Sequence, residues 1–178
     1  MVAREVQRVK IESFLHDERR FALQDPTETD PFVDLGALQE AALLDVRIDL
    51  IRSRALMLFD LKGALQVRDG NTGVLVIDKL ESLDSEMPVE PFDYHYPTVV
   101  GWVPSSLYGN VTIEIGLLSD ASYRVVGQGG EFFVGNVPGM DEAPPDVLKA
   151  NEDGILAGFQ NWSSEFEPLQ ALFHQKSS

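Results

Sequence analysis

Residues 43–61 read LLDVRIDLIRSRALMLFDL and carry the clearest structural pattern in the chain. From 44 to 50 apolar and charged residues alternate, as in a β-strand with one buried and one solvated face. The polar stretch 51–54 predicts a turn, and residues 55–61 are apolar apart from Asp60, which is typical of a strand covered on both faces. A short buried helix over 55–61 would give the same apolar run, but the flanking turn favours a strand hairpin.

The pattern of short apolar runs and turn residues continues toward the C-terminus. Residues 64–68 and 74–78 flank the turn-forming sequence DGNTG at 69–73, which predicts a second hairpin. Residues 82–97 contain three prolines and predict a surface loop, with an edge strand over 92–96 as the alternative. Further strands are expected at 99–103, 111–118, 123–127 and 131–134, with a closing strand or an extended strap at 162–173.

Helical patterns occur only near the two chain ends. Residues 3–22 have apolar residues at helical spacing, and residues 146–160 suit one helix, or two short ones interrupted near Gly154. We therefore expect an α+β fold, a mostly antiparallel β meander of about eight strands, forming a curved sheet or a small sandwich with helices near both termini. The expected division is an N-terminal helix over 1–24, a loop or linker over 25–37, a single β-rich domain over 38–174 and a disordered tail over 175–178.

The charge is strongly negative and unevenly distributed. The 178 residues carry a net charge of −15. Residues 1–68 hold 10 Lys and Arg against 12 Asp and Glu, which gives −2, while residues 69–178 hold 4 against 17, which gives −13. An acidic surface repels phosphate backbones and acidic lipids and attracts basic partners, although it also serves solubility. We expect no nucleic-acid or membrane partner.

Several chemistries are excluded or disfavoured by composition. The chain has no cysteine, so it has no disulfide, no thiolate metal site and no cysteine nucleophile. It shows neither the apolar run of a signal peptide at its start nor about 20 consecutive apolar residues, and we expect a cytoplasmic protein. No phosphate-binding glycine loop, nucleophile elbow or histidine pair at metal spacing occurs, so no cofactor or metal is expected.

Two groups of residues are candidates for a binding site. If residues 92–96 form a strand, Asp93 and His95 share a face and form, with Trp102, a pocket for a small molecule or a reaction; otherwise this segment is a polar loop with aromatic anchors. Basic residues also cluster between 47 and 68 and suit a phosphate group, although Arg47 is better explained by pairing with its acidic neighbours Asp45 and Asp49. The basic residues are Arg47, Arg52, Arg54, Lys62 and Arg68.

Residues 38–49 (LQEAALLDVRID) followed by 56–61 (LMLFDL) resemble a group of small β-rich bacterial proteins that includes immunity proteins of polymorphic toxin systems. The group usually opens with His-Asp-Ala before its first strand, and this chain has Gln39-Glu40-Ala41 there. The resemblance covers about 40 residues and implies a non-enzymatic bacterial protein that binds another protein.

Three functions are therefore considered. The first is an acidic, non-enzymatic module, of inhibitor or immunity type, that binds a basic protein. The second is a small-molecule binder or enzyme that uses Asp93, His95 and Trp102. The third is a structural or assembly protein that forms homo-oligomers, such as a homodimer, through residues 56–61.

Overall fold

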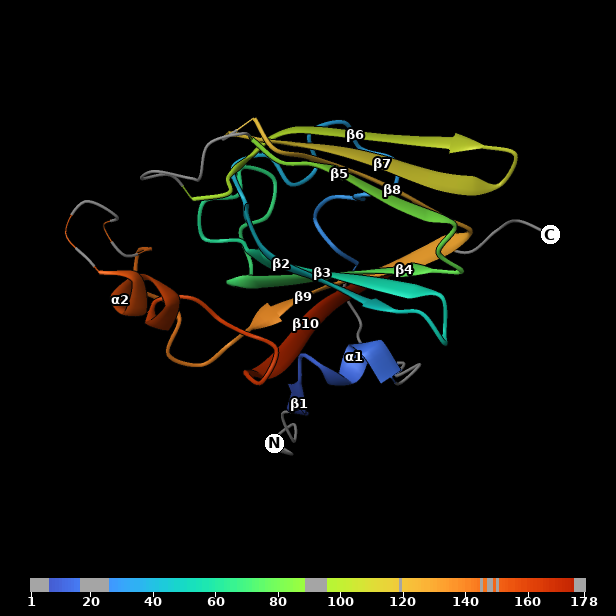
Figure 1. The fold of residues 1–178 in the computed structure, drawn as a ribbon. Helices are drawn as coiled ribbons and strands as arrows, with labels where there is room; N and C mark the ends of the chain where they lie inside the picture. Colours follow the sequence, from blue (N-terminus) through green and yellow to red (C-terminus); the bar gives the residue numbers. More distant parts are fainter. Residues whose placement is uncertain are drawn as a thin grey trace.

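The computed structural model describes residues 7–16, 26–88, 96–118, 120–144, 146, 149 and 151–174. These residues form two antiparallel sheets and two short helices, α1 (Ser13–His16) and α2 (Glu152–Ala157) (Figure 1). The large sheet has six strands, in the order β1 (Val9–Lys10), β10 (Glu165–His174), β9 (Gly129–Asn136), β4 (Thr72–Asp78), β3 (Arg54–Asp60) and β2 (Ala42–Asp49). The small sheet has four, in the order β5 (Ser82–Glu86), β8 (Ser122–Gly127), β7 (Asn110–Leu117) and β6 (Val99–Leu107).

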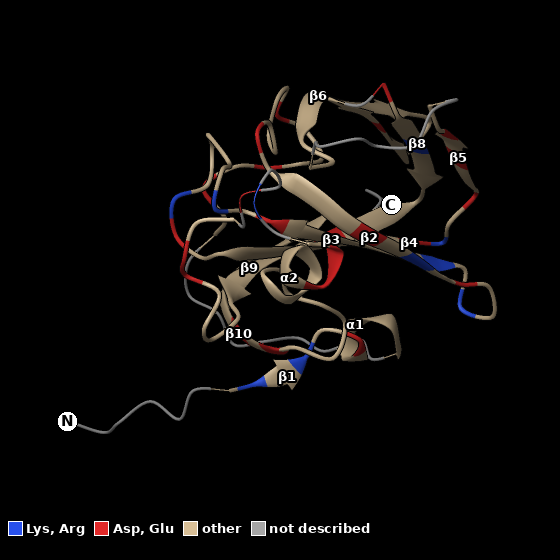
Figure 2. Ribbon diagram, turned by 60° about the vertical axis from the view of Figure 1, so that its left-hand side comes forward, with Lys and Arg blue, Asp and Glu red and all other residues tan. Residues whose placement is uncertain are grey.

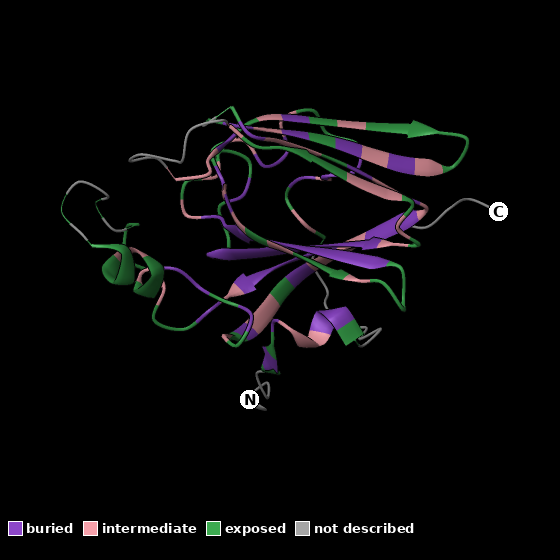
Figure 3. Ribbon diagram, in the orientation of Figure 1, coloured by how far each residue is buried: buried purple, intermediate pink, exposed green. Residues whose placement is uncertain are grey.

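The two sheets face each other, and the central strands β3, β4 and β9 of the large sheet are buried on both sides (Figures 1 and 3). Ala55, Met57 and Phe59 of β3 point into an inter-sheet core that also contains Trp102 and Ile113 of the small sheet. The intervening residues of β3 point the other way, into a second core closed by α1 and by the start of β10. Every residue of β3 is buried, which confirms the prediction of a strand covered on both faces.

The strand order departs from a simple meander. β4 pairs with β9 and β5 pairs with β8, so strands distant in the sequence are neighbours. The described residues contain ten strands, whereas about eight were expected. One of the additional strands is β5, which lies in the segment predicted as a loop, and residues 89–95 of that segment lie outside the described residues. β10 shows that the C-terminal segment forms a strand rather than an irregular strap.

The predicted helix over 3–22 is wrong for residues 7–12. Val9 and Lys10 form β1, which pairs with Phe166 and Glu165 of β10, and helical structure is limited to α1. Pairing places Val9 in the second core, and this tertiary burial outweighs a weak local helical preference. The other parts of the predicted helix, residues 3–6 and 17–22, lie outside the described residues. Near the other end of the chain, α2 is shorter than the predicted helix, and it contains Gly154.

The predicted hairpin around residues 69–73 is also wrong. Residues 64–68 form no strand, and β4 pairs instead with β3 across the connection 61–71. The reason is that Asn71 serves as a buried anchor for neighbouring loops, so it is unavailable for a tight turn between two strands.

Residues 26–40 bridge the two sheets on one side of the molecule. The carbonyl oxygen of Pro31 accepts a hydrogen bond from Trp102 Nε1 at 2.9 Å, and the Phe32 ring stacks on His174 of β10 at 5.1 Å. The Gly36 N–H donates to the Trp102 carbonyl at 2.9 Å. This segment therefore contacts both the edge of the small sheet and the end of the large one.

Candidate functional site

Of the three residues predicted for a small-molecule pocket, only Trp102 is described. It is 1% exposed and packs edge-to-face on Phe59, with ring centroids 5.9 Å apart. Its indole N–H is bound to Pro31, so the whole side chain belongs to the inter-sheet core. Asp93 and His95 lie outside the described residues, and a pocket shared with them stays a prediction.

The basic residues that cluster in the sequence separate in the structure. Arg47 lies over the Trp162 ring, 4.9 Å from its centroid, rather than pairing with a neighbouring carboxylate. Arg52 bonds to Asp49 at 2.8 Å. The Lys62 Nζ atom lies 3.4 Å from Asp60 Oδ2. Arg52 and Arg54 line one cavity together.

That cavity has a volume of about 720 Å³ and lies at one end of the large sheet. Arg54 is held in it by Asp78 at 2.8 Å and by the Phe14 carbonyl at 3.3 Å. Other charged or titratable residues of its lining are His16, Arg52, Lys79, Glu131 and His174. Counting Arg52, Arg54 and Lys79 against Asp78 and Glu131, the lining has a net charge of +1 with neutral histidines.

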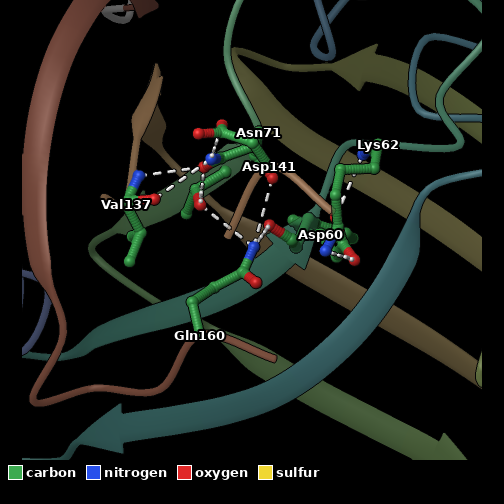
Figure 4. Close-up of polar contacts among 8 residues, drawn as sticks. Asp60, Lys62, Asn71, Val137, Asp141 and Gln160 are labelled. Atoms are coloured by element: carbon green, nitrogen blue, oxygen red, sulfur yellow. Dashed lines mark hydrogen bonds and ion pairs between the residues drawn. The ribbon is translucent and has the colours of Figure 1, made fainter. Parts of the chain in front are cut away.

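A buried polar cluster lies at one edge of β3 and β4 (Figure 4). Gln160 Nε2 donates to the Phe59 and Asn71 carbonyls and to Thr72 Oγ1, at 3.0 to 3.3 Å. Asn71 donates to the Val137 carbonyl at 3.1 Å and to Asp141 at 3.0 Å, and accepts from the Val137 N–H at 2.9 Å. The cluster ties three loops to the sheet, so its role is structural.

Asp60 in this cluster is 2% exposed. Burial raises its pKa, and the backbone N–H and ammonium group of Lys62 oppose that rise. Burial also raises the pKa of Tyr96, with smaller contributions from the charges of Asp146 and Asp60. Asp60 Oδ2, Tyr96 Oη and Gln160 Oε1 are buried without a hydrogen-bond partner, a costly arrangement that the lysine charge offsets for Asp60.

The outer face of the small sheet is largely exposed to solvent. Its inner residues fill the inter-sheet core, while the alternate residues point away from it. Across the four strands, Asp84, Arg124, Glu114 and Val103 form one row, and Glu86, Ser122, Gly116 and Gly101 form the next. No described helix or strand covers this face (Figure 1).

The second row has no side chains on β6 and β7, because its members there are both glycines. Gly101 and Gly116 are paired, and a Cβ added to either would meet nothing closer than 3.8 Å. The result is a groove of about 450 Å³, whose lining includes both glycines, Val103 and Tyr123. We call it the glycine groove. Interior strand glycines weaken a sheet and often mark close approach by another molecule.

Acidic residues stand on β5 at the edge of the small sheet (Figure 2), and three carboxylates line the glycine groove. Asp84, Glu86 and Glu114 all line it, against Arg124 as its one described cation, so its net charge is −2. Arg124 Nε lies 3.5 Å from Glu114, an exposed ion pair that contributes little stability. The Tyr123 side chain lies on the opposite face of β8, against the inter-sheet core, where burial and the charge of Asp45 raise the pKa of its phenol.

The sequence alone gave a partial signal for this surface. The strands of the small sheet all lie in the strongly acidic part of the chain. The facing glycines were missed, because Gly101 and Gly116 stand on different strands and only the register pairs them.

Other kinds of site find no support in the described residues. No three His, Asp or Glu side chains among them are grouped to hold a metal ion, and none of the described helices is long and apolar enough to cross a membrane. No protein-family model, curated protein or solved structure matches this chain.

Proposed function

We propose that this chain is a non-enzymatic binding protein that holds a basic segment of another protein on the outer face of the small sheet. The observation that carries the proposal is the open glycine groove, rimmed by Asp84, Glu86 and Glu114. A groove with an apolar floor and a negative rim complements side chains that combine an aliphatic stem with a positive charge.

The edge of β6 favours docking on the face over addition of a strand. The carbonyls of Val99 and Trp102 already accept hydrogen bonds from the N–H groups of Glu40 and Gly36. Further along, Pro104 has no N–H to offer to a partner strand. A partner that approaches this side of the molecule therefore meets exposed side chains rather than an open row of backbone groups.

The experiment is capture from a lysate of the source organism with wild-type protein and with a triple variant, Asp84→Lys, Glu86→Lys and Glu114→Lys. A basic protein retained by the wild type should be lost with the triple variant, and its purified form should bind the wild type more weakly as salt rises. The measurement is the dissociation constant for that purified partner at low salt and at about 0.5 M salt.

The matched control makes the same charge change elsewhere. Asp69→Lys, Glu142→Lys and Asp153→Lys replace three exposed carboxylates that lie off the small sheet. This control should bind within about threefold of the wild type, because only long-range attraction is reduced. Equal losses in the two triple variants, or binding that is insensitive to salt, would contradict the proposal.

A second candidate function is the binding of a small anion in the cavity at the end of the large sheet. Its lining contains three of the chain's 14 Lys and Arg residues and two of its three histidines, in a protein with a charge of −15. Sulfate should raise the melting temperature more than chloride at equal ionic strength. Lys79→Gln should abolish the difference, whereas Lys149→Gln, an exposed lysine outside the cavity, should retain it.

A further inference from the structure

We infer that the glycine groove is a receptor for a single arginine side chain of the partner. This inference rests on the proposed function and names the group that the acidic face recognises. Its basis is the combination of a floor without side chains and a carboxylate at one end of the same row.

The floor of the groove runs across the strands. Gly101, Gly116 and Ser122 are neighbours on β6, β7 and β8, and Glu86 of β5 follows them in register. Strands lie about 4.8 Å apart, so Glu86 is roughly 10 Å from Gly116. A long side chain that extends along this row from a backbone above Gly116 can therefore bring its end group to Glu86.

The depth and lining of the groove suit the stem of that side chain. The missing Cβ groups of Gly101 and Gly116 let methylene groups lie directly on the sheet backbone. Val103, two residues after Gly101 on the same face of β6, supplies an apolar wall. Long basic side chains bury such stems while their charged ends stay solvated.

The carboxylates favour arginine over lysine. Asp84 and Glu86 lie two residues apart on β5 and point to the same face. A planar guanidinium donates to two acceptors in a fixed fork, and it is more weakly hydrated than an ammonium group. The row beside the groove already contains one arginine–carboxylate ion pair, between Arg124 and Glu114.

The test uses the full chain, labelled with ¹⁵N at its 14 glycines, and titrated with N-acetyl-arginine amide. We expect saturable shifts of the Gly101 and Gly116 amide signals, with the Gly139 signal unmoved because that residue lies in a distant turn. The lysine analogue should bind about fivefold more weakly, and the neutral citrulline analogue should cause no saturable shift.

Two leucine variants separate the groove from the rest of the face. Gly116→Leu fills the floor and should abolish the shift at Gly101, while Thr112→Leu places the same side chain on the same face of β7, outside the groove. Circular dichroism and urea midpoints check that both variants fold. Equal responses to arginine and lysine, an unchanged response in Gly116→Leu, or no shift in the wild type would each overturn the inference.

These outcomes are independent of the test of the proposed function. If the charge-reversed face loses its protein partner but Gly116→Leu retains it, the acidic face binds the partner without an arginine receptor. If the control reversal loses the partner equally, the proposed function fails irrespective of the titration.

Discussion

Individual polar residues hold the ends of the strands in place. The buried side chains of Asn71 and Gln160 each form several hydrogen bonds to protein groups in place of water. Each of the two residues joins segments that are far apart in the sequence. Asp60 differs from them because it brings a charge into the protein interior and has Lys62 as its counter-ion. These residues are therefore the places where single substitutions have large and distinguishable effects on stability.

Asp60→Asn should alter the pH dependence of stability. The folded state holds a proton on Asp60 more tightly than the unfolded state, because burial raises its pKa above the ordinary value of 3.8. The stabilisation from this proton is complete below 3.8 and is lost as pH rises through the folded-state pKa. Asparagine does not titrate, so the stability of the variant relative to the wild type should increase with pH in that window.

The measurement is the free energy of unfolding in urea from about pH 4 to about pH 8. Asp69→Asn, which changes an exposed carboxylate in a turn, is the control. A stability difference between Asp60→Asn and the wild type that stays constant over this range would refute the prediction.

Asn71→Ala should destabilise the fold by at least about 2 kcal/mol. The substitution leaves the N–H and carbonyl groups of Val137 without their partner in a buried position. Urea unfolding gives the value. The control is Asn110→Ala, which removes one exposed hydrogen bond to Glu81 and should change stability by less than about 0.5 kcal/mol. Similar losses of stability in the two variants would show that the buried cluster contributes no more than an exposed hydrogen bond.

At the scale of elements, the glycines on the strands differ in how closely neighbouring atoms approach them. On β9, Gly135 lies against the backbone of β10, whereas on the small sheet Gly101 faces open space. Some strand glycines are therefore required for packing, and others leave a surface unoccupied. The two kinds cannot be distinguished by residue type, only by the neighbour that each one meets.

Gly135→Ala should cost about 1–3 kcal/mol through overpacking. Its Cβ would lie 2.3 Å from the Glu167 carbonyl oxygen and 2.6 Å from the Phe166 ring, and the backbone oxygen cannot move without separating β9 from β10. Gly101→Ala is the matched control, because its nearest neighbour would be 3.8 Å away. Thermal unfolding of both variants tests the contrast, and a stable Gly135→Ala would mean that the two strands separate easily.

At the scale of the whole molecule, the described residues form two hydrophobic cores, which lie on opposite faces of the same strands. The alternating residues of β3 and β4 belong to the inter-sheet core on one face and to the second core on the other. Loss of either core would expose apolar residues of the same strands, so neither is stable without the other. Acidic residues also line the groove on the outer face of the small sheet.

The two tryptophans test this coupling, because Trp102 lies in the inter-sheet core and Trp162 in the second core. In the variants Trp162→Phe and Trp102→Phe, the fluorescence of the remaining tryptophan should follow the same urea transition as far-UV circular dichroism. The reason is that β3 and β4 contribute side chains to both cores. A fluorescence transition that precedes the loss of sheet structure in one variant would show that its core melts separately.

Local pattern by itself determined the β-rich, antiparallel character, the doubly buried strand over 55–60 and the acidic surface, because alternation, apolar runs and charge are properties of neighbouring residues. It could not determine the pairing of β4 with β9, the strand at Val9–Lys10 or the anchor role of Asn71, since each depends on a partner more than 50 residues away. The facing of Gly101 and Gly116 depends instead on the register of two consecutive strands. A glycine pattern is invisible until the register of two strands is fixed, so only the tertiary structure decided where the candidate groove lies.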